Sequence, residues 1–256
     1  MLNRVLIVLI SLIIQSCYWQ ADYGLINNWK SYPVPANADT LRKYNNSLNE
    51  WCVSIGNNIV QVNKYKPSYQ SIVPFKINPN PADKSKMIGV VSFVKVADGY
   101  LIGFNGGEWR GHLYWFANDG KNYYEISDDQ IVQFIKRNGQ IYAIQGLAHL
   151  GISEGSIIKI EKKDGKWAAK EYLKLPKAPY CFSVDSEKDF IVLTSNNLLK
   201  VDSSKSIKTI VNAGVWSNGL YPNSLVIKDD IVYAGMRAGV YKYNLSNGKQ
   251  EWLLPY

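Results

Sequence analysis

The sequence predicts an all-β protein, and three features support this prediction. Aromatic residues make up 13% of the 256 residues, and they favour β-strands because they pack well on a pleated surface. Short runs rich in apolar and β-branched residues alternate with Asp-Gly and Asn-Gly pairs, which are typical of tight hairpin turns because those turns require positive φ. The same four-strand pattern recurs at intervals of about 40–50 residues.

The clearest copy of this pattern runs from Val90 to Ser127. Its four expected strands are 90–96, 100–104, 112–116 and 123–126. Asp98-Gly99 predicts a tight turn between the first two strands, and 118–120 predicts another between the last two. The middle connection, 105–111, is longer and carries one aromatic and two charged residues.

Three further copies follow, beginning near Ile131, Tyr180 and Ser224. The equivalent first-strand positions, which are separated by 41, 48 and 43 residues, are Phe93, Phe134, Phe182 and Leu225. Their middle connections are expected at 145–155, 195–197 and 235–239, and the second of these is short.

A shorter unit precedes these copies. It contains three strand-like runs, 51–55, 59–63 and 71–77. Pro74 lies within the third run and indicates an edge strand or a bulge, because proline cannot donate a ladder hydrogen bond. Residues 78–83 are rich in Asn and Pro and are expected to form a linker.

Four strands per unit at this period resemble the blades of β-propeller repeat proteins. The segment VYAGMRAGVYKYN, residues 232–244, is similar to the second and third strands of many blades. The resemblance implies a propeller domain over 51–256 with five blades of four antiparallel strands, in which an N-terminal or C-terminal segment completes the first blade. No specific propeller family is matched, since the Trp-Asp dipeptide of WD40 repeats is missing. A two-sheet sandwich is the alternative, which the regular spacing disfavours.

Residues 1–17 are expected to be a signal peptide. An apolar run from Val5 to Ile14, interrupted only by Ser11, is too short to span a membrane but fits a signal-peptide core. Residues 14–17 resemble the lipobox of bacterial lipoproteins, although Gln15 departs from that motif. The resemblance implies acylation of Cys17 and a periplasmic-side anchor in the outer membrane. An ordinary signal peptide is the alternative, which would leave the protein in the periplasm.

Residues 18–50 are expected to be a tether and an irregular N-terminal extension, with room for one strand that pairs with the C-terminus. Beyond it, Cys52 and Cys181 form an even pair in an exported chain. A disulfide between them and two buried thiols are both compatible with the spacing.

The net charge of +8 suits an acidic partner, such as an acidic protein or anionic lipid. The sequence has no run of five like charges and no Lys/Arg-rich block, so we expect no nucleic-acid binding. A soluble surface with a basic bias is the simplest interpretation of the charge.

In a propeller, the middle loops and the connections between blades share one face, which we call the loop face. Binding residues concentrate on loops that a rigid scaffold holds, so we expect the site on this face. The candidate binding residues are Glu108, Trp109, Arg110, His112, His149, Trp216, Tyr221 and Arg237. Trp and Arg are frequent interface anchors, although Trp109 and Trp216 could instead pack between blades.

No catalytic residue, metal or cofactor is predicted. The only histidines are His112 and His149, and they lie in separate segments without the spacing of metal ligands, although Glu108 and Glu154 could join them. Residues 151–155 match Gly-x-Ser-x-Gly by spacing, but the expected strand 156–160 follows them, whereas a nucleophile elbow requires a helix there. We therefore expect a non-catalytic cell-envelope protein that binds a protein partner, for example an immunity protein or an inhibitor of a periplasmic toxin. A carbohydrate-active or other hydrolytic propeller and a small-ligand sensor are the alternatives.

Cys17→Ser should release the protein from membranes, because the lipobox-like context makes the Cys17 thiol the expected acylation site. Cell fractionation and acyl-chain labelling of the wild type and the variant would measure this. A soluble wild-type protein without an acyl label would contradict the prediction.

Overall fold

The computed structural model describes residues 24–66 and 73–255. The predicted signal peptide and Cys17 lie outside the described residues. The described chain is all-β apart from one short α-helix, α1 (Ala38–Asn45), and three 3-10 turns, η1 (Ile26–Asn28), η2 (Gly107–Trp109) and η3 (Val215–Asn218). No helix among the described residues is long and apolar enough to cross a membrane.

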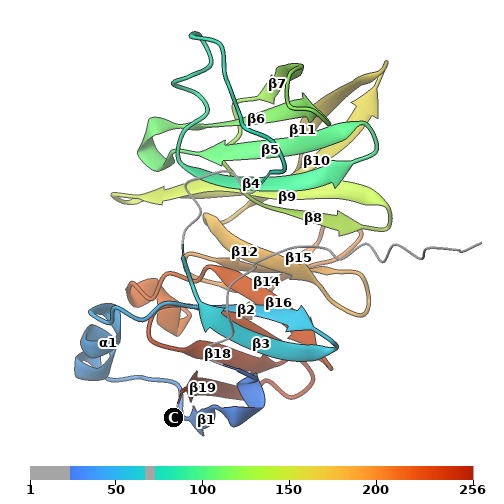
Figure 1. Ribbon diagram of the computed structural model, residues 1–256. Helices are drawn as coiled ribbons and strands as arrows, with labels where there is room; N and C mark the ends of the chain where they lie inside the picture. Colours follow the sequence, from blue (N-terminus) through green and yellow to red (C-terminus); the bar gives the residue numbers. More distant parts are fainter. Residues whose placement is uncertain (1–23, 67–72, 256) are drawn as a thin grey trace, which may run out of the picture.

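The strands form five antiparallel sheets (Figure 1). The first sheet has two strands, β2 (Trp51–Gly56) and β3 (Ile59–Lys64). Three sheets have four strands each: β4 (Val90–Val96), β5 (Gly99–Asn105), β6 (Gly111–Ala117) and β7 (Tyr123–Ser127); β8 (Ile131–Arg137), β9 (Gln140–His149), β10 (Ile152–Lys163) and β11 (Lys166–Leu175); and β12 (Pro179–Val184), β13 (Phe190–Thr194), β14 (Leu198–Val201) and β15 (Ile207–Val211). The last sheet has five: β16 (Ser224–Lys228), β17 (Ile231–Gly235), β18 (Val240–Asn244), β19 (Gln250–Leu254) and the N-terminal strand β1 (Lys30–Tyr32).

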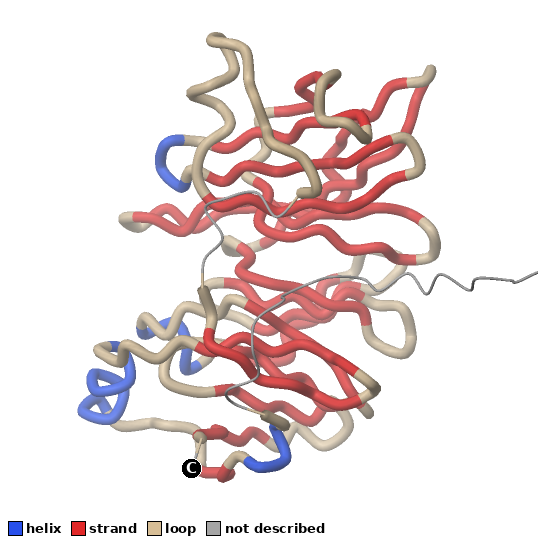
Figure 2. Tube along the Cα trace, in the orientation of Figure 1, coloured by secondary structure: helices blue, strands red, loops and turns tan. Residues whose placement is uncertain are grey.

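The sheets follow one another in a propeller-like order. The first strand of each sheet contacts the first strand of the next, from β4 through β8, β12 and β16 to β2. Figure 2 shows that α1, η2 and η3 all lie on one side of these sheets. That side also carries the connections between sheets, so it corresponds to the predicted loop face.

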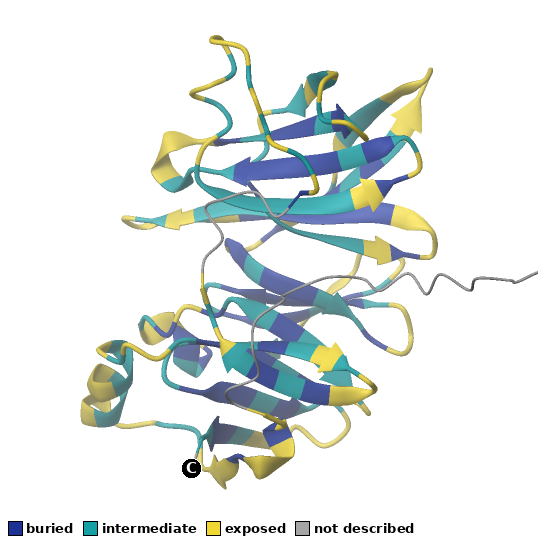
Figure 3. Cartoon of the chain, viewed as in Figure 1, coloured by how far each residue is buried: buried dark blue, intermediate teal, exposed yellow. Residues whose placement is uncertain are grey.

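Apolar side chains fill the space between neighbouring sheets. Leu101 and Leu113 of one sheet pack against Ile131 and Ile158 of the next, and similar clusters lie between the later sheets. The strands in the middle of a sheet are therefore covered on both faces, as Figure 3 shows for β5. This explains why such strands are almost uniformly apolar, with little alternation of polar residues.

Two of the predicted tight turns have the expected backbone, whereas at Asp98-Gly99 neither residue has positive φ and the turn residues are 97 and 98. Asn138 and Gly139 have φ of 49° and 73°, and Asp164 and Gly165 have φ of 47° and 81°. Two successive residues with positive φ are characteristic of the hairpin turn whose twist matches that of the flanking strands.

The first predicted unit differs from the expected blade. The third run, 71–77, forms no strand over its described part, 73–77. Instead Val73, Phe75 and Ile77 pack on the outer apolar face of the β4–β7 sheet, and Met87, which follows the predicted linker, joins them. The segment 73–87 is thus a cover for that sheet. Burying these apolar side chains outweighs strand pairing at a position where Pro74 has no amide hydrogen to donate.

The N-terminal strand is found, but it completes a different sheet. Lys30, Ser31 and Tyr32 pair with Leu254, Leu253 and Trp252 of β19. The prediction that the extension holds a strand pairing with the C-terminus is confirmed. The prediction that every unit has four strands is wrong, because the first sheet has two and the last has five.

The inner edges of two sheets are capped by side chains from a neighbouring sheet. The Gln133 side chain donates from Nε2 to the Phe182 carbonyl at 3.2 Å and accepts from the Phe182 amide at 3.0 Å. Ser224 Oγ accepts from the Val53 amide at 2.8 Å. These contacts satisfy backbone groups that would otherwise form an open strand edge.

The proposed disulfide does not form. The Cys181 thiol is fully buried in the core on β12 and is free, and burial raises its pKa well above the ordinary value. It therefore behaves as a small apolar side chain in an apolar cluster.

Glu251 on β19 accepts a hydrogen bond from Ser31 on β1, and its lowered pKa predicts that the stability of the protein depends on pH. Hydrogen bonds from Lys242 and Ser31, and a further one from Lys249, lower the pKa of Glu251 to about 2. Because this pKa is depressed below its unfolded value of about 4.3, the stabilisation is present above that pH and is lost as the pH falls toward 2. Glu251→Gln should lower the free energy of unfolding at pH 7 by about 0.5–1 kcal/mol.

Thermal unfolding from pH 7 to pH 2.5 would measure this effect, and the difference between wild type and variant should shrink as the pH falls. Glu171→Gln is the control, since Glu171 is exposed and forms no ion pair with the described residues. A difference in stability between wild type and Glu251→Gln that stays constant with pH would contradict the stabilising role of the ionised Glu251 carboxylate.

Candidate functional site

A hollow of about 520 Å³ opens where the ends of the inner strands converge on the loop face. We call it the central hollow. All five sheets contribute to its wall, each at a strand end or at the adjoining connection. The lining residues are Tyr65, Gly89, Val90, Asn105, Gly106, Gly107, Ile131, Val132, Gln133, Gly146, Leu147, Ala148, Pro179, Tyr180, Pro222 and Asn223.

The wall of the central hollow carries no Asp, Glu, Lys or Arg side chain. Its polar groups are neutral amides and tyrosine hydroxyls. Gln133 is held by its two hydrogen bonds to Phe182, and Asn105 Oδ1 accepts from the Gly107 amide at 3.0 Å. Asn223 Oδ1 accepts from Ser224 Oγ at 2.9 Å, whereas Asn223 Nδ2 is buried and has no partner among the described residues.

Tyr180 lies on the wall of the hollow beside Tyr221. Burial, with a smaller contribution from the neighbouring Tyr221, raises the pKa of Tyr180 above its usual range. The Tyr180 hydroxyl therefore stays protonated at neutral pH and is able both to donate and to accept a hydrogen bond.

Glycine is required at one point of this wall. Gly146 has φ of 153°, and a Cβ there would lie 2.4 Å from the carbonyl oxygen of Glu154. The close approach of these two strands thus shapes the wall beside Leu147 and Ala148. A larger residue would push the β9–β10 hairpin outward.

Beside the hollow, the predicted residues Glu108 and Trp109 lie in η2. The Glu108 carboxylate is 2.9 Å from His149 Nε2, at the end of β9, outside hydrogen-bond geometry but in direct contact, so η2 and the end of β9 lie side by side. Trp109 is 74% exposed. Arg110, which follows η2 with φ of 78°, forms no ion pair with the described residues.

The prediction of a long loop at 145–155 is wrong, because most of this segment is strand. β9 and β10 continue as a hairpin whose turn is Leu150-Gly151, with φ of 45° and 89°. Leu150 is 90% exposed and Ile152 is 49% exposed at its tip. The sequence analysis did not select these two residues as candidates, although two apolar residues that flank a turn glycine could have indicated an exposed apolar tip.

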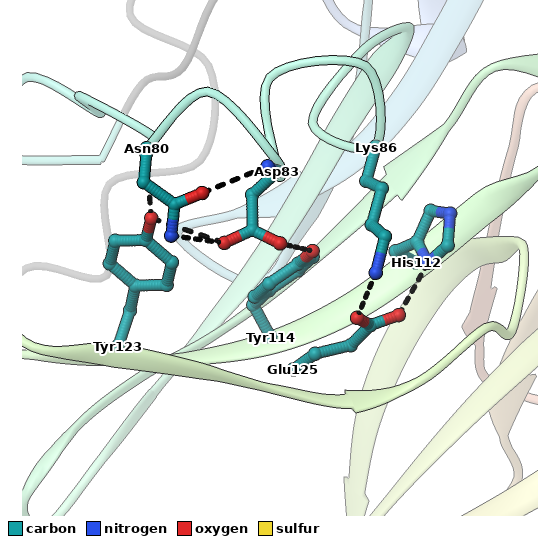
Figure 4. A network of polar contacts seen from close by, with 7 residues as sticks. All are labelled: Asn80, Asp83, Lys86, His112, Tyr114, Tyr123 and Glu125. Atoms are coloured by element: carbon teal, nitrogen blue, oxygen red, sulfur yellow. Dashed lines mark hydrogen bonds and ion pairs between the residues drawn. The ribbon is translucent and has the colours of Figure 1, made fainter.

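His112 belongs to a polar network that does not include His149 (Figure 4). Its Nδ1 is 2.7 Å from Glu125 Oε1, and Lys86 Nζ is 2.6 Å from the other carboxylate oxygen. Burial alone would raise the pKa of Glu125, but the hydrogen bonds from Lys86 and His112 outweigh it and hold that pKa below its usual range. The idea that both histidines bind one metal ion is therefore not supported by their positions.

The other half of this network is centred on Asp83. Its carboxylate accepts from the hydroxyls of Tyr114 at 3.1 Å and Tyr123 at 3.2 Å, and from Asn80 Nδ2 at 2.8 Å (Figure 4). Asp83 and Lys86 belong to the covering segment 73–87, while Tyr114, Tyr123 and Glu125 belong to the sheet beneath. The network therefore fastens the cover to the sheet, and its acidic groups are already paired.

Trp216 is not an exposed anchor. It is 1% exposed, its Nε1 donates to the Thr194 carbonyl at 2.9 Å, and its ring packs edge-on against Tyr241. The alternative interpretation, packing inside the fold, is the one the structure bears out for this residue.

Arg237 is also tied into the fold. Its guanidinium donates to Glu50 Oε1 at 3.0 and 2.7 Å and to the carbonyl and side-chain oxygens of Asn45 at 2.9 and 3.1 Å. It lies 4.6 Å from the centre of the Tyr221 ring, which is 50% exposed. Arg237 thus fixes the N-terminal extension to the last sheet and positions Tyr221 near the hollow.

Among the described residues, one group of acidic side chains has the spacing of metal ligands, namely Asp185, Glu187 and Asp189. The ammonium of Lys200 lies between them, 2.9 Å from Asp185 and 3.2 Å from Asp189, and also bonds Glu187. The Lys200 ammonium therefore already supplies the positive charge that a metal ion would bring to these carboxylates.

The comparisons with known proteins are distant. No family model and no curated relative matches the chain. Among solved structures, a streptogramin B lyase is 16% identical with a TM-score of 0.43, covering 65% of this chain and 54% of its own. The extracellular domain of a putative one component system from B. thetaiotaomicron is 13% identical with a TM-score of 0.48, covering 89% of this chain and 29% of its own.

A third structure, PorZ, a surface component of the type-IX secretion system of Porphyromonas gingivalis, is 8% identical with a TM-score of 0.45, covering 80% of this chain and 32% of its own. The chain spans about half of the lyase and less than a third of the one component system domain. Similarities at this level carry no conclusion about activity or ligand. The fold and the site together define an all-β protein of propeller-like sheet order with a neutral hollow on its loop face.

The two predicted arginines should behave differently on substitution. Arg237→Ala should lower the free energy of unfolding by about 1–3 kcal/mol, because it removes four hydrogen bonds and leaves Glu50 half-buried without its partner. Arg110→Ala should change it by less than about 0.5 kcal/mol, since Arg110 is exposed. Chemical denaturation followed by circular dichroism would compare the two, and equal losses would contradict the assigned roles.

Proposed function

We propose that the protein is a non-catalytic binding protein of the cell envelope that presents its loop face to a protein partner. The observation that carries this proposal is a cluster of exposed side chains beside the central hollow. The cluster, which we call the rim patch, consists of Trp109, Arg110, Leu150 and Ile152.

The rim patch has the physical properties of an interaction surface. Trp109 and Leu150 are 74% and 90% exposed, and they lie on segments joined by the Glu108–His149 contact. When a partner covers large apolar side chains that lie together on the surface, the free energy of the complex falls. A tight hairpin and a 3-10 turn hold them, so little conformational entropy is lost on binding.

Arg110 adds a charge that suits an acidic group on the partner. It forms no ion pair with the described residues, and a guanidinium binds a carboxylate through two parallel hydrogen bonds. The net charge of +8 favours the same kind of partner.

A hydrolytic role receives less support. Glycoside hydrolysis, for example, requires two carboxyl groups that face the scissile bond. The lining of the central hollow includes none, and Glu108, Asp83 and Glu125 are engaged by other side chains.

The lipobox-like residues 14–17 support a location at the periplasmic side of the outer membrane, through a lipid on Cys17. An immunity protein or an inhibitor of a periplasmic toxin is one role that an anchored, non-catalytic binding protein would fill there. Identification of the partner tests this role directly.

Photo-crosslinking in the native cell tests the rim patch. A photoreactive residue at position 150 should give a discrete adduct with a partner, whereas one at position 166, at the start of β11 and beside the turn at the opposite end of β10, should not. Trp109→Ala should reduce the adduct at position 150 about fivefold or more, the range expected for an interface anchor. Adducts that are equal at both positions, or unaffected by Trp109→Ala in folded protein, would contradict the proposal.

A further inference from the structure

The central hollow has the size and construction of a small-molecule site. Its volume of about 520 Å³ falls within the range of about 300–1,000 Å³ that is usual for such sites. Its wall is built by strand ends from five sheets whose cores are packed, so its shape is held before any ligand enters. The rim patch lies outside this hollow and is a separate feature.

The chemistry of the wall excludes a charged ligand. A formal charge that enters the hollow loses hydration, and that loss is costly unless an opposite charge compensates it. Among the 16 described lining residues there is no carboxylate, ammonium or guanidinium group. The ligand that fits is therefore neutral.

Two polar groups of the wall lack partners. Asn223 Nδ2 is buried without an acceptor, and a buried donor left unsatisfied costs about 1–3 kcal/mol. The Tyr180 hydroxyl is protonated at neutral pH and forms no hydrogen bond with a side chain of the described residues. Together they offer one donor and one group that both donates and accepts, which matches ligand hydroxyls.

Apolar surfaces alternate with these polar groups. The wall contains the rings of Tyr65, Tyr180, Pro179 and Pro222. A ligand that presents C–H faces to such rings and hydroxyls to the amides uses both kinds of surface. A saccharide ring has this combination.

A peptide strand fits the hollow less well. Peptides are commonly bound by adding a strand to an open sheet edge. Here the inner edge of β12 is occupied at Phe182 by the Gln133 side chain, and that of β2 is occupied at Val53 by Ser224.

We propose that the central hollow is a binding site for a neutral saccharide, with Asn223 and Tyr180 as its polar contacts. This inference does not depend on the protein partner. It assigns a second, small-molecule function to the same face.

Saturation-transfer NMR tests the proposal on protein purified after expression of the full chain. The probes are the neutral disaccharides maltose, cellobiose, lactose and N,N′-diacetylchitobiose, with glucuronate and glucosamine 6-phosphate as charged counterparts. At least one neutral disaccharide should show transfer, and the charged sugars should not. Absence of transfer to every neutral probe, or equal transfer to the charged ones, would overturn the proposal.

Substitutions in the wall of the central hollow test whether the sugar binds there. Ala148→Trp, on the exposed part of the wall, should block the hollow and abolish transfer, while Lys166→Trp at the start of β11, beyond the opposite end of β10, should not. Tyr180→Phe removes only a hydroxyl and should weaken binding about fivefold, the effect of one lost hydrogen bond. Transfer that persists in Ala148→Trp would show that the sugar binds elsewhere. Crosslinking at position 150 reads out the protein partner separately, so either proposal can fail alone.

Discussion

Covering both apolar faces of every four-stranded sheet is the constraint on which this structure depends. Each inner face is buried against the next sheet in the series, as with Leu101 against Ile131. Among the described residues β2 and β4 make no contact comparable to those along the series, so the β4–β7 sheet has one apolar face that no neighbouring sheet covers. The segment 73–87 covers that face on the β4–β7 sheet, and the network of Asp83 and Glu125 fastens it there.

In the first sheet only one face is apolar and has to be covered. One of its faces, with Trp51 and Val53, packs on η1 and the last sheet, whereas the other carries polar residues such as Ser54 and Gln61. Because that second face is polar, two strands suffice and no further sheet has to pack on it. The N-terminal β1 is then available to extend the last sheet.

The site follows from how the sheets converge. Strand ends meet around the central hollow, and the connections between sheets surround it on the same side. The charged candidates Glu108 and Arg237 are used in contacts that hold the loops in place. The loop face therefore carries a hollow with an uncharged lining and, beside it, the exposed side chains of the rim patch.

The sequence by itself determined the all-β class, the repeat spacing and turns such as Asn138-Gly139, because these depend on turn chemistry and periodicity within a few residues of the chain. Only the tertiary structure decided that Trp216 is buried, that Arg237 bonds Glu50, and that Leu150 protrudes at a hairpin tip. Each of these depends on residues far away in the chain or on how far a strand continues beyond its sheet. Burial and pairing are properties of the packed whole, so no local pattern specifies them.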